Sequence, residues 1–272
     1  EKVFAGYISY DKNWEKWTLS TGLRAEQTNI EAKSESVTEN NNQNYLEWFP
    51  TANLGLQASE KLNIYVNYKR SITRPNYGHL NPFRYYLNDN TYVTGNPNLK
   101  PFFTDQYKLG FSINDMFVIE TYYKKYKNNI FELPIQDNTN NTLAHTSVNI
   151  NYTEEVGLDF EAYFDVTEKW STYFGTSFYK YQDNATLFNS TFSKGKWTNY
   201  SILQNDFTFL KDNSLTANFT LTYVHKNVQG LQDVGTTIFT NFSIRKSMFK
   251  GKGILSLSIS DLLNEQNFFV AT

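Results

Sequence analysis

Strict alternation of apolar and polar residues runs through almost the whole chain, and it limits the possible folds more than any other feature. It is clearest in residues 62–68, 156–164, 215–223 and 254–260. Successive side chains of a β-strand point to opposite faces, so a period of two predicts strands with one apolar and one polar face. No sustained helical period is visible. The chain is therefore expected to be all-β.

The alternating segments are long, and about twelve of them follow one another. They cover residues 3–10, 17–27, 46–58, 62–72, 106–113, 116–125, 148–166, 170–181, 197–210, 215–226, 236–248 and 254–260. Short polar turns, such as Asn114–Asp115, alternate with longer polar loops at 31–44, 71–104, 128–145 and 182–194. Strands of about nine to eleven residues suit a tilted strand that crosses a bilayer. Short turns on one side and long loops on the other are typical of an outer-membrane barrel.

A soluble β-sandwich or propeller piece would show the same alternation, because it also has one buried and one wet face. Two features favour a membrane barrel. The strands are longer than those of ordinary globular sheets. Aromatic residues also gather near the short turns, as in an interfacial belt: Tyr10, Trp14, Trp17, Trp170 and Phe249. We therefore predict an antiparallel up-and-down meander that forms part of a transmembrane β-barrel.

Composition argues against several function classes. The formal net charge of −2 gives no basic footprint for nucleic acid. The chain has no cysteine, which excludes disulfides and thiolate metal sites. His79, His145 and His225 lack the spacing of a metal pair. Asp159 and Glu161 share a polar strand face, where ordinary lumenal polarity or salt bridges with lysine are expected. Neither an enzymatic activity nor a cofactor is predicted.

Residues 71–104 interrupt the alternation and hold four of the six prolines of the chain. Proline fixes φ and lacks an N–H donor, so this stretch is expected to be neither a central strand nor a helix. A loop this long is usually functional or disordered, and its aromatic and arginine content argues against disorder.

The middle of this loop is the candidate ligand site. Aromatic faces stack on sugars or chelated ligands, and arginine binds carboxylates or phosphates. The candidate ligand-binding residues are Tyr77, His79, Arg84, Tyr85, Tyr86 and Tyr92. The alternative is that these side chains pack the loop onto the barrel wall, and this structural role is the one expected for Arg74 and the prolines.

Three pieces of the same stretch resemble a known family. The segments are 71–75 (SITRP), 80–83 (LNPF) and 95–101 (GNPNLKP). In this order they resemble the TonB-dependent receptor β-barrel, most closely its outer membrane protein β-barrel subfamily. Residues 47–54 and 258–264 are similar to further segments of that family. The chain departs from the pattern at Phe102, where glutamate is usual, and at Leu263, where phenylalanine is common.

The resemblance implies a single β-barrel segment over residues 1–272, with a long outer loop at 72–104 and without the plug domain and terminal strand of the family. It implies active uptake of a scarce nutrient, a siderophore, glycan or peptide, across the cell outer membrane. The implied partners are outer-membrane lipid, the TonB complex through a plug, a small nutrient ligand and, as a further candidate, a surface substrate-binding lipoprotein. A passive porin or structural barrel and a soluble β-rich carbohydrate-binding module are the alternative functions.

Overall fold

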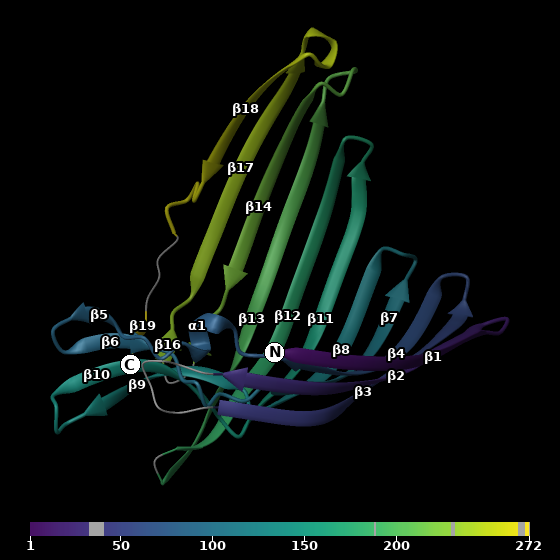
Figure 1. The fold of residues 1–272 in the computed structure, drawn as a ribbon. Coiled ribbons are helices and arrows are strands. Elements are labelled where there is room, and N and C mark those ends of the chain that lie inside the picture. Colours follow the sequence, from purple (N-terminus) through teal and green to yellow (C-terminus); the bar gives the residue numbers. More distant parts are fainter. Residues whose placement is uncertain (33–40, 188, 230–231, 266–269, 272) are drawn as a thin grey trace.

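The computed structural model describes residues 1–32, 41–187, 189–229, 232–265 and 270–271. Its main element is one curved antiparallel sheet of twelve strands, in which consecutive hairpins lie side by side (Figure 1). The predicted all-β meander of about twelve strands is therefore confirmed. In their order in the sheet, the strands are β1 (Lys2–Asn13), β2 (Trp17–Ala32), β3 (Asn41–Ser59), β4 (Leu62–Thr73), β7 (Phe102–Ile113), β8 (Phe117–Lys127), β11 (Tyr152–Thr167), β12 (Trp170–Leu187), β13 (Ser190–Phe209), β14 (Leu215–Val224), β17 (Thr237–Met248) and β18 (Gly253–Ser260).

The strands extend further into the polar regions than the sequence pattern predicts. The loop expected at 182–194 is largely a continuation of β12 and β13, which pair in register as far as Leu187 and Ser190. Strands β2 and β3 also extend into the loop expected at 31–44, since β2 ends at Ala32 and β3 begins at Asn41. Residues 33–40 of that loop lie outside the described residues. Backbone pairing needs no apolar side chains, so a hairpin can continue after the apolar alternation has ended.

The connection between β4 and β7 is not the irregular loop that its prolines predict. It contains a one-turn helix, α1 (Tyr77–Leu80), and the short strands β5 (Tyr85–Asn88) and β6 (Thr91–Thr94). Helix α1 forms because the Asn76 side chain caps it, its Oδ1 accepting a hydrogen bond from the His79 N–H at 2.9 Å. The expectation that this stretch contains no helix was wrong, since Pro75 and Pro82 flank the helix and do not interrupt it.

The loop expected at 128–145 is a hairpin of β9 (Ile130–Asp137) and β10 (Thr142–Asn149). Strand β10 also pairs in parallel with β6, so the two connections join in a four-stranded sheet of order β5-β6-β10-β9. A three-stranded sheet holds β15 (Asn227–Gln229), β16 (Gln232–Val234) and β19 (Val270–Ala271). Both small sheets lie at the end of the main sheet opposite its short turns (Figure 1).

The short turns follow the local sequence. The connection of β7 and β8 consists of the three residues 114–116, with positive φ at Asn114 (52°) and Asp115 (55°). Asparagine and aspartate tolerate positive φ at low cost, and a tight turn whose twist matches the right-handed twist of its strands requires it. The predicted tight hairpin is confirmed. A 3-10 turn, η1 (Phe249–Gly251), joins β17 to β18.

The two faces of the main sheet differ in chemistry. One face, here called the apolar face, presents residues such as Val156, Leu158, Leu255 and Leu257, of which Leu158 is 50% and Leu257 56% exposed. The opposite face, here called the polar face, carries charged, amide and hydroxyl side chains. A water-soluble protein buries most of its large apolar side chains, so a regular row of exposed leucines is not expected in one. No helix among the described residues is long and apolar enough to cross a membrane.

Two glycines of the polar face are covered by tyrosines from neighbouring strands. A Cβ added at Gly110 would lie 2.2 Å from Cζ of Tyr65, and one added at Gly157 would lie 2.6 Å from Cζ of Tyr122. Each ring therefore lies flat across the place where a side chain would stand. This packing lets large tyrosines fit on the inside of a curved sheet, and it fixes the direction of their hydroxyl groups.

We expect Gly110→Ala to destabilise the sheet by about 1–3 kcal/mol, the usual cost of overpacking, because Tyr65 must leave its position. The measurement is the temperature at which the folded full-length protein loses its compact form on a gel. Gly6→Ala is the matched control, since no atom lies within 4 Å of the Cβ it would add. Equal melting temperatures for both variants would contradict the proposed packing.

Candidate functional site

Arg74 connects the start of the long β4–β7 connection to the second strand of the sheet. Its Nη2 donates to Glu26 Oε2 at 2.7 Å and to Thr28 Oγ1 at 3.0 Å. Glu26 is only 3% exposed and also pairs with Arg24 at 2.6 Å. A buried carboxylate requires such partners. The structural role expected for Arg74 is supported by these contacts.

The segment 95–101 is likewise held by backbone and amide hydrogen bonds. The Gly95 N–H donates to the Asn81 carbonyl at 2.8 Å, and the Asn96 N–H donates to the His79 carbonyl at 2.7 Å. The Asn96 side chain donates to the Ser147 carbonyl of β10 at 3.0 Å. Leu99 is 1% exposed. This segment therefore ties the α1 turn to strand β10.

The predicted ligand residues are only partly brought together. The Arg84 guanidinium carbon lies 4.6 Å from the centroid of the Tyr92 ring, and the rings of Tyr86 and Tyr92 are 5.5 Å apart. We call these three residues, Arg84, Tyr86 and Tyr92, the aromatic–arginine cluster. Tyr85 is adjacent in sequence to Tyr86 and so lies on the other face of β5, where it is 71% exposed.

Tyr77 and His79 lie on α1, apart from this cluster. Tyr77 is 77% exposed. His79 has a buried Nδ1 with no hydrogen-bond partner among the described residues. Its backbone carbonyl supports the segment that follows β6. His79 is therefore integrated into the loop framework, whereas the hairpin side chains are open to solvent.

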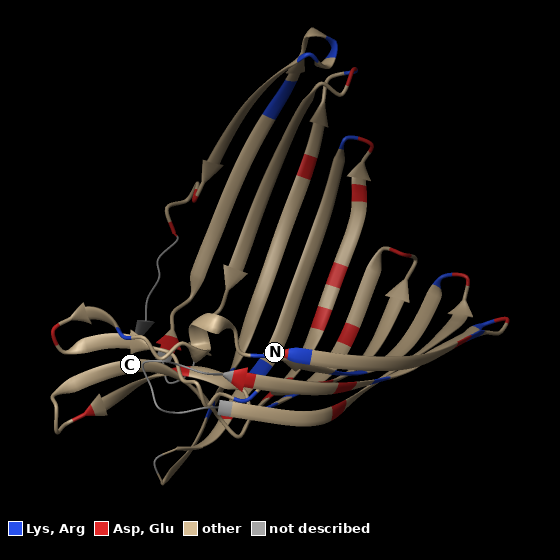
Figure 2. Cartoon of the chain, viewed as in Figure 1, with Lys and Arg blue, Asp and Glu red and all other residues tan. Residues whose placement is uncertain are grey.

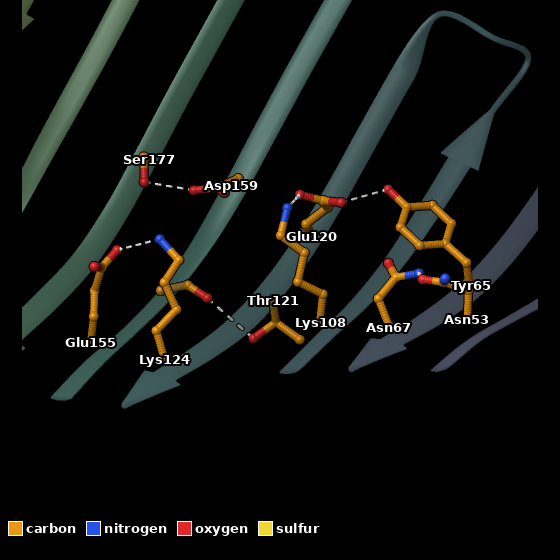
Figure 3. Close-up of polar contacts among 11 residues, drawn as sticks. Asn53, Tyr65, Asn67, Lys108, Glu120, Thr121, Lys124, Glu155, Asp159 and Ser177 are labelled. Atoms are coloured by element: carbon orange, nitrogen blue, oxygen red, sulfur yellow. Dashed lines mark hydrogen bonds and ion pairs between the residues drawn. The ribbon is translucent and has the colours of Figure 1, made fainter. Parts of the chain in front are cut away.

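The polar face of the main sheet holds a second group of functional side chains (Figure 3). Glu120 accepts a hydrogen bond from the Tyr65 hydroxyl at 2.8 Å and pairs with Lys108 at 2.6 Å. Lys124 pairs with Glu155 at 3.0 Å. Each contact joins different strands, so the pairs cross-link the sheet as well as neutralise charge.

Asp159 and Glu161 follow on the same face of β11, as the sequence alternation predicts. Asp159 accepts a hydrogen bond from Ser177 Oγ at 2.6 Å. Figure 2 shows acidic residues within β8 and β11, away from the strand ends where most other charges lie. Sequence reasoning did not identify Tyr65, Glu120 and Lys124, although their alternate positions on the polar face were a usable signal.

Part of this polar face forms a hollow of about 380 Å³. Its lining includes Tyr122, Lys124, Glu155, Asp159, Tyr173 and Tyr200. Tyrosine hydroxyls and paired charges can hydrogen-bond a polar solute or a polypeptide segment. Among the described residues, no group of three histidine, aspartate or glutamate side chains is arranged to bind a metal ion.

Comparison with known proteins identifies the family. The profile of the Outer membrane protein beta-barrel family matches residues 1–272. The chain belongs to this family. Its cellular location is therefore the outer membrane, its apolar face contacts lipid, and its polar face lines the barrel lumen. The alternative of a soluble module is overturned. The comparison with curated proteins found no match.

Solved structures with the same fold are outer-membrane receptors and transporters. The siderophore receptor PirA of Pseudomonas aeruginosa aligns with a TM-score of 0.66 and 16% identity, over 98% of this chain and 47% of that one. The FrpB iron transporter of Neisseria meningitidis (F5-1 variant) gives 0.68 and 15%, over 98% and 43%. The copper transporter OprC gives 0.68 and 12%, over 96% and 41%. The chain thus spans less than half the length of these proteins, and identities this low show the fold alone.

We expect Arg74→Met to destabilise the full-length protein by about 1–3 kcal/mol, because Glu26 stays buried with one cation fewer. Arg24→Met is the matched control: it removes the other guanidinium from the same carboxylate, but Arg24 is largely exposed and should contribute less than about 1 kcal/mol. Denaturant unfolding in detergent measures both values. Equal destabilisation by the two variants would contradict the role of Arg74 in holding the start of the β4–β7 connection to β2.

The assignment of the two faces predicts opposite responses to charge at adjacent residues. Leu257→Arg on the lipid face should cost up to about 2–4 kcal/mol and reduce assembly into outer-membrane vesicles. Ser258→Arg, one residue further on the lumenal face, should leave assembly near the level of the unchanged protein. Assembly is measured as the folded fraction on an unheated gel. The opposite ranking would reverse the assignment of the faces.

Proposed function

We propose that this chain is the barrel portion of a TonB-dependent receptor that takes up a scarce nutrient, such as a siderophore, glycan or peptide. The observation that carries the proposal is the combination of a polar, cross-linked lumenal wall with a partly exposed aromatic–arginine cluster on a structured outer loop. A ligand would first meet the cluster and then pass along the lumen. The named receptors and transporters of the same fold support a transport role.

The outer-loop sheet is suited to ligand capture. Its backbone is fixed by the hydrogen bonds of segment 95–101, so the exposed side chains of β5 and β6 start from a defined geometry. Preorganisation of this kind lowers the entropy lost when a ligand binds. Tyrosine faces and a guanidinium on one hairpin would stack on a planar or sugar-like group and bind an adjacent acidic group.

The energy for uptake would come from the TonB complex acting on a plug domain, and a surface substrate-binding lipoprotein is a candidate partner at the outer loops. Both belong to the proposal for the whole protein. The proposed role is binding and transport, which requires no covalent chemistry, and the lumenal side chains described above form ion pairs and hydrogen bonds.

The proposal predicts that replacing Arg84, Tyr85 and Tyr86 together by alanine reduces nutrient-dependent growth or labelled-ligand uptake at least about tenfold. Arg84 and Tyr86 belong to the cluster, and loss of one good aromatic or charge-assisted contact is worth about 1–2 kcal/mol, so the loss of both contacts exceeds the 1.4 kcal/mol of a tenfold change. The replaced residues are exposed, so the barrel should still assemble.

Asn138→Ala with Thr139→Ala is the control, because it alters the exposed tip of the neighbouring β9–β10 hairpin without touching the cluster. Uptake by this control should match that of the unchanged receptor. Normal uptake by the triple variant would assign the hairpin side chains a purely structural role.

A further inference from the structure

Two lysines lie side by side at the outer end of the lumenal wall. Lys194 and Lys196 are two residues apart on β13, so they point to the same face. The strand register places Lys196 beside Tyr181 of β12, and Tyr181 beside Glu155 of β11, which belongs to the polar face. The two ammonium groups are therefore on the lumenal side, near the tip of the β12–β13 hairpin.

Both lysines contact the same carboxylate, that of Asp233. Lys196 Nζ is 3.2 Å from Asp233 Oδ1, and Lys194 Nζ is 3.5 Å from Asp233 Oδ2. The hydrogen bond from Lys196 and the positive charge of both lysines hold the pKa of the Asp233 carboxyl below its usual value. One carboxylate thus bridges two cations, as the acidic group of a bound ligand would.

The element that carries Asp233 distinguishes this contact from the other lumenal ion pairs. Lys108–Glu120 and Lys124–Glu155 join strands of the barrel sheet itself, so their geometry is fixed by the sheet register. Asp233 instead lies on the three-residue strand β16, which belongs to a separate small sheet. Its side chain is 50% exposed, and those of the lysines are about one-third exposed. An external anion can reach the lysines and displace Asp233.

The other acidic neighbour of the pair has a different role. Asp183 lies beside Lys194 in the register of β12 and β13. It is fully buried, and its Oδ1 accepts a hydrogen bond from Thr153 Oγ1 at 2.6 Å. This interaction holds Asp183 against β11, so its carboxylate does not bridge the two lysines as Asp233 does. The exchangeable carboxylate is that of Asp233.

We propose that Lys194 and Lys196 form an anion-binding site at the outer rim of the lumen, and that Asp233 occupies it until the carboxylate or phosphate of an incoming ligand takes its place. The inference deepens the proposed function, on which it rests, by assigning an acidic ligand to the receptor. When the carboxylate of the ligand replaces that of Asp233, both lysines keep an anionic partner. Opening the site therefore leaves no cation unpaired in the lumen.

The test is calorimetric titration of the detergent-solubilised full-length protein with citrate, a small polyanion. Asp233→Asn removes the competing carboxylate and should tighten citrate binding up to about fivefold, the upper value expected for an accessible ion pair. Lys194→Met with Lys196→Met should weaken binding about tenfold or more. The affinity of the unchanged protein should fall with added sodium chloride.

Lys250→Met with Lys252→Met, in the exposed turn at the far end of the barrel, is the matched control for loss of two positive charges and should bind citrate as the unchanged protein does. The inference is overturned if Asp233→Asn binds citrate no more tightly than the unchanged protein, or if the Lys194/Lys196 variant binds it equally well. A local rearrangement of β16 in Asp233→Asn also vacates the lysines, so the expected direction stays the same.

Nutrient uptake by the same variants separates the two proposals. If the variants bind citrate as expected but the unchanged protein supports no nutrient uptake, the anion site stands and the transport function is refuted. Normal uptake with unchanged citrate affinity in all variants would leave the transport function in place and refute the anion site.

Discussion

Backbone hydrogen bonding without water is the constraint on which the rest of this structure depends. In hydrocarbon, an unpaired N–H or C=O costs several kcal/mol, so membrane-spanning strands must pair along their whole length. The chain meets this requirement by placing each strand of the main sheet beside the next main-sheet strand along the chain, through short turns in some places and long connections in others. Among the described residues, only β1 and β18 have a single partner in the main sheet, so the sheet is open at two edges.

Backbone pairing is the same for both faces of the sheet, so the two faces differ only in their side chains. Leucine, valine and phenylalanine face lipid, and the polar residues gather on the lumenal side. There, Tyr65 and Tyr122 lie over Gly110 and Gly157, and the hydroxyl of Tyr65 bonds Glu120. The glycines and the carboxylates thus serve one purpose: they let large amphipathic rings pack on the inside of a curved sheet with their polar atoms satisfied.

The long connections use the same backbone pairing beyond the end of the main sheet. Two long connections combine into one four-stranded sheet, and the segments rich in proline and glycine position it above the barrel. Arg74 anchors the start of the first connection to β2, and Asn96 bonds to β10, whereas Arg84 and Tyr86 are exposed and Tyr92 is half-buried. The candidate capture site and the Lys194–Lys196 pair therefore lie on hydrogen-bonded strands.

The sequence by itself determined the twelve strands, their two faces and the tight turn at Asn114–Asp115, because residue parity and local φ preference fix these properties within a few residues. It also placed Asp159 and Glu161 correctly on the polar face. Only the tertiary structure decided that Arg74 meets Glu26, that β6 pairs with β10, and that Asp233 bridges Lys194 and Lys196. Those contacts join residues tens of positions apart, and the path of the intervening loops depends on packing that no local pattern encodes.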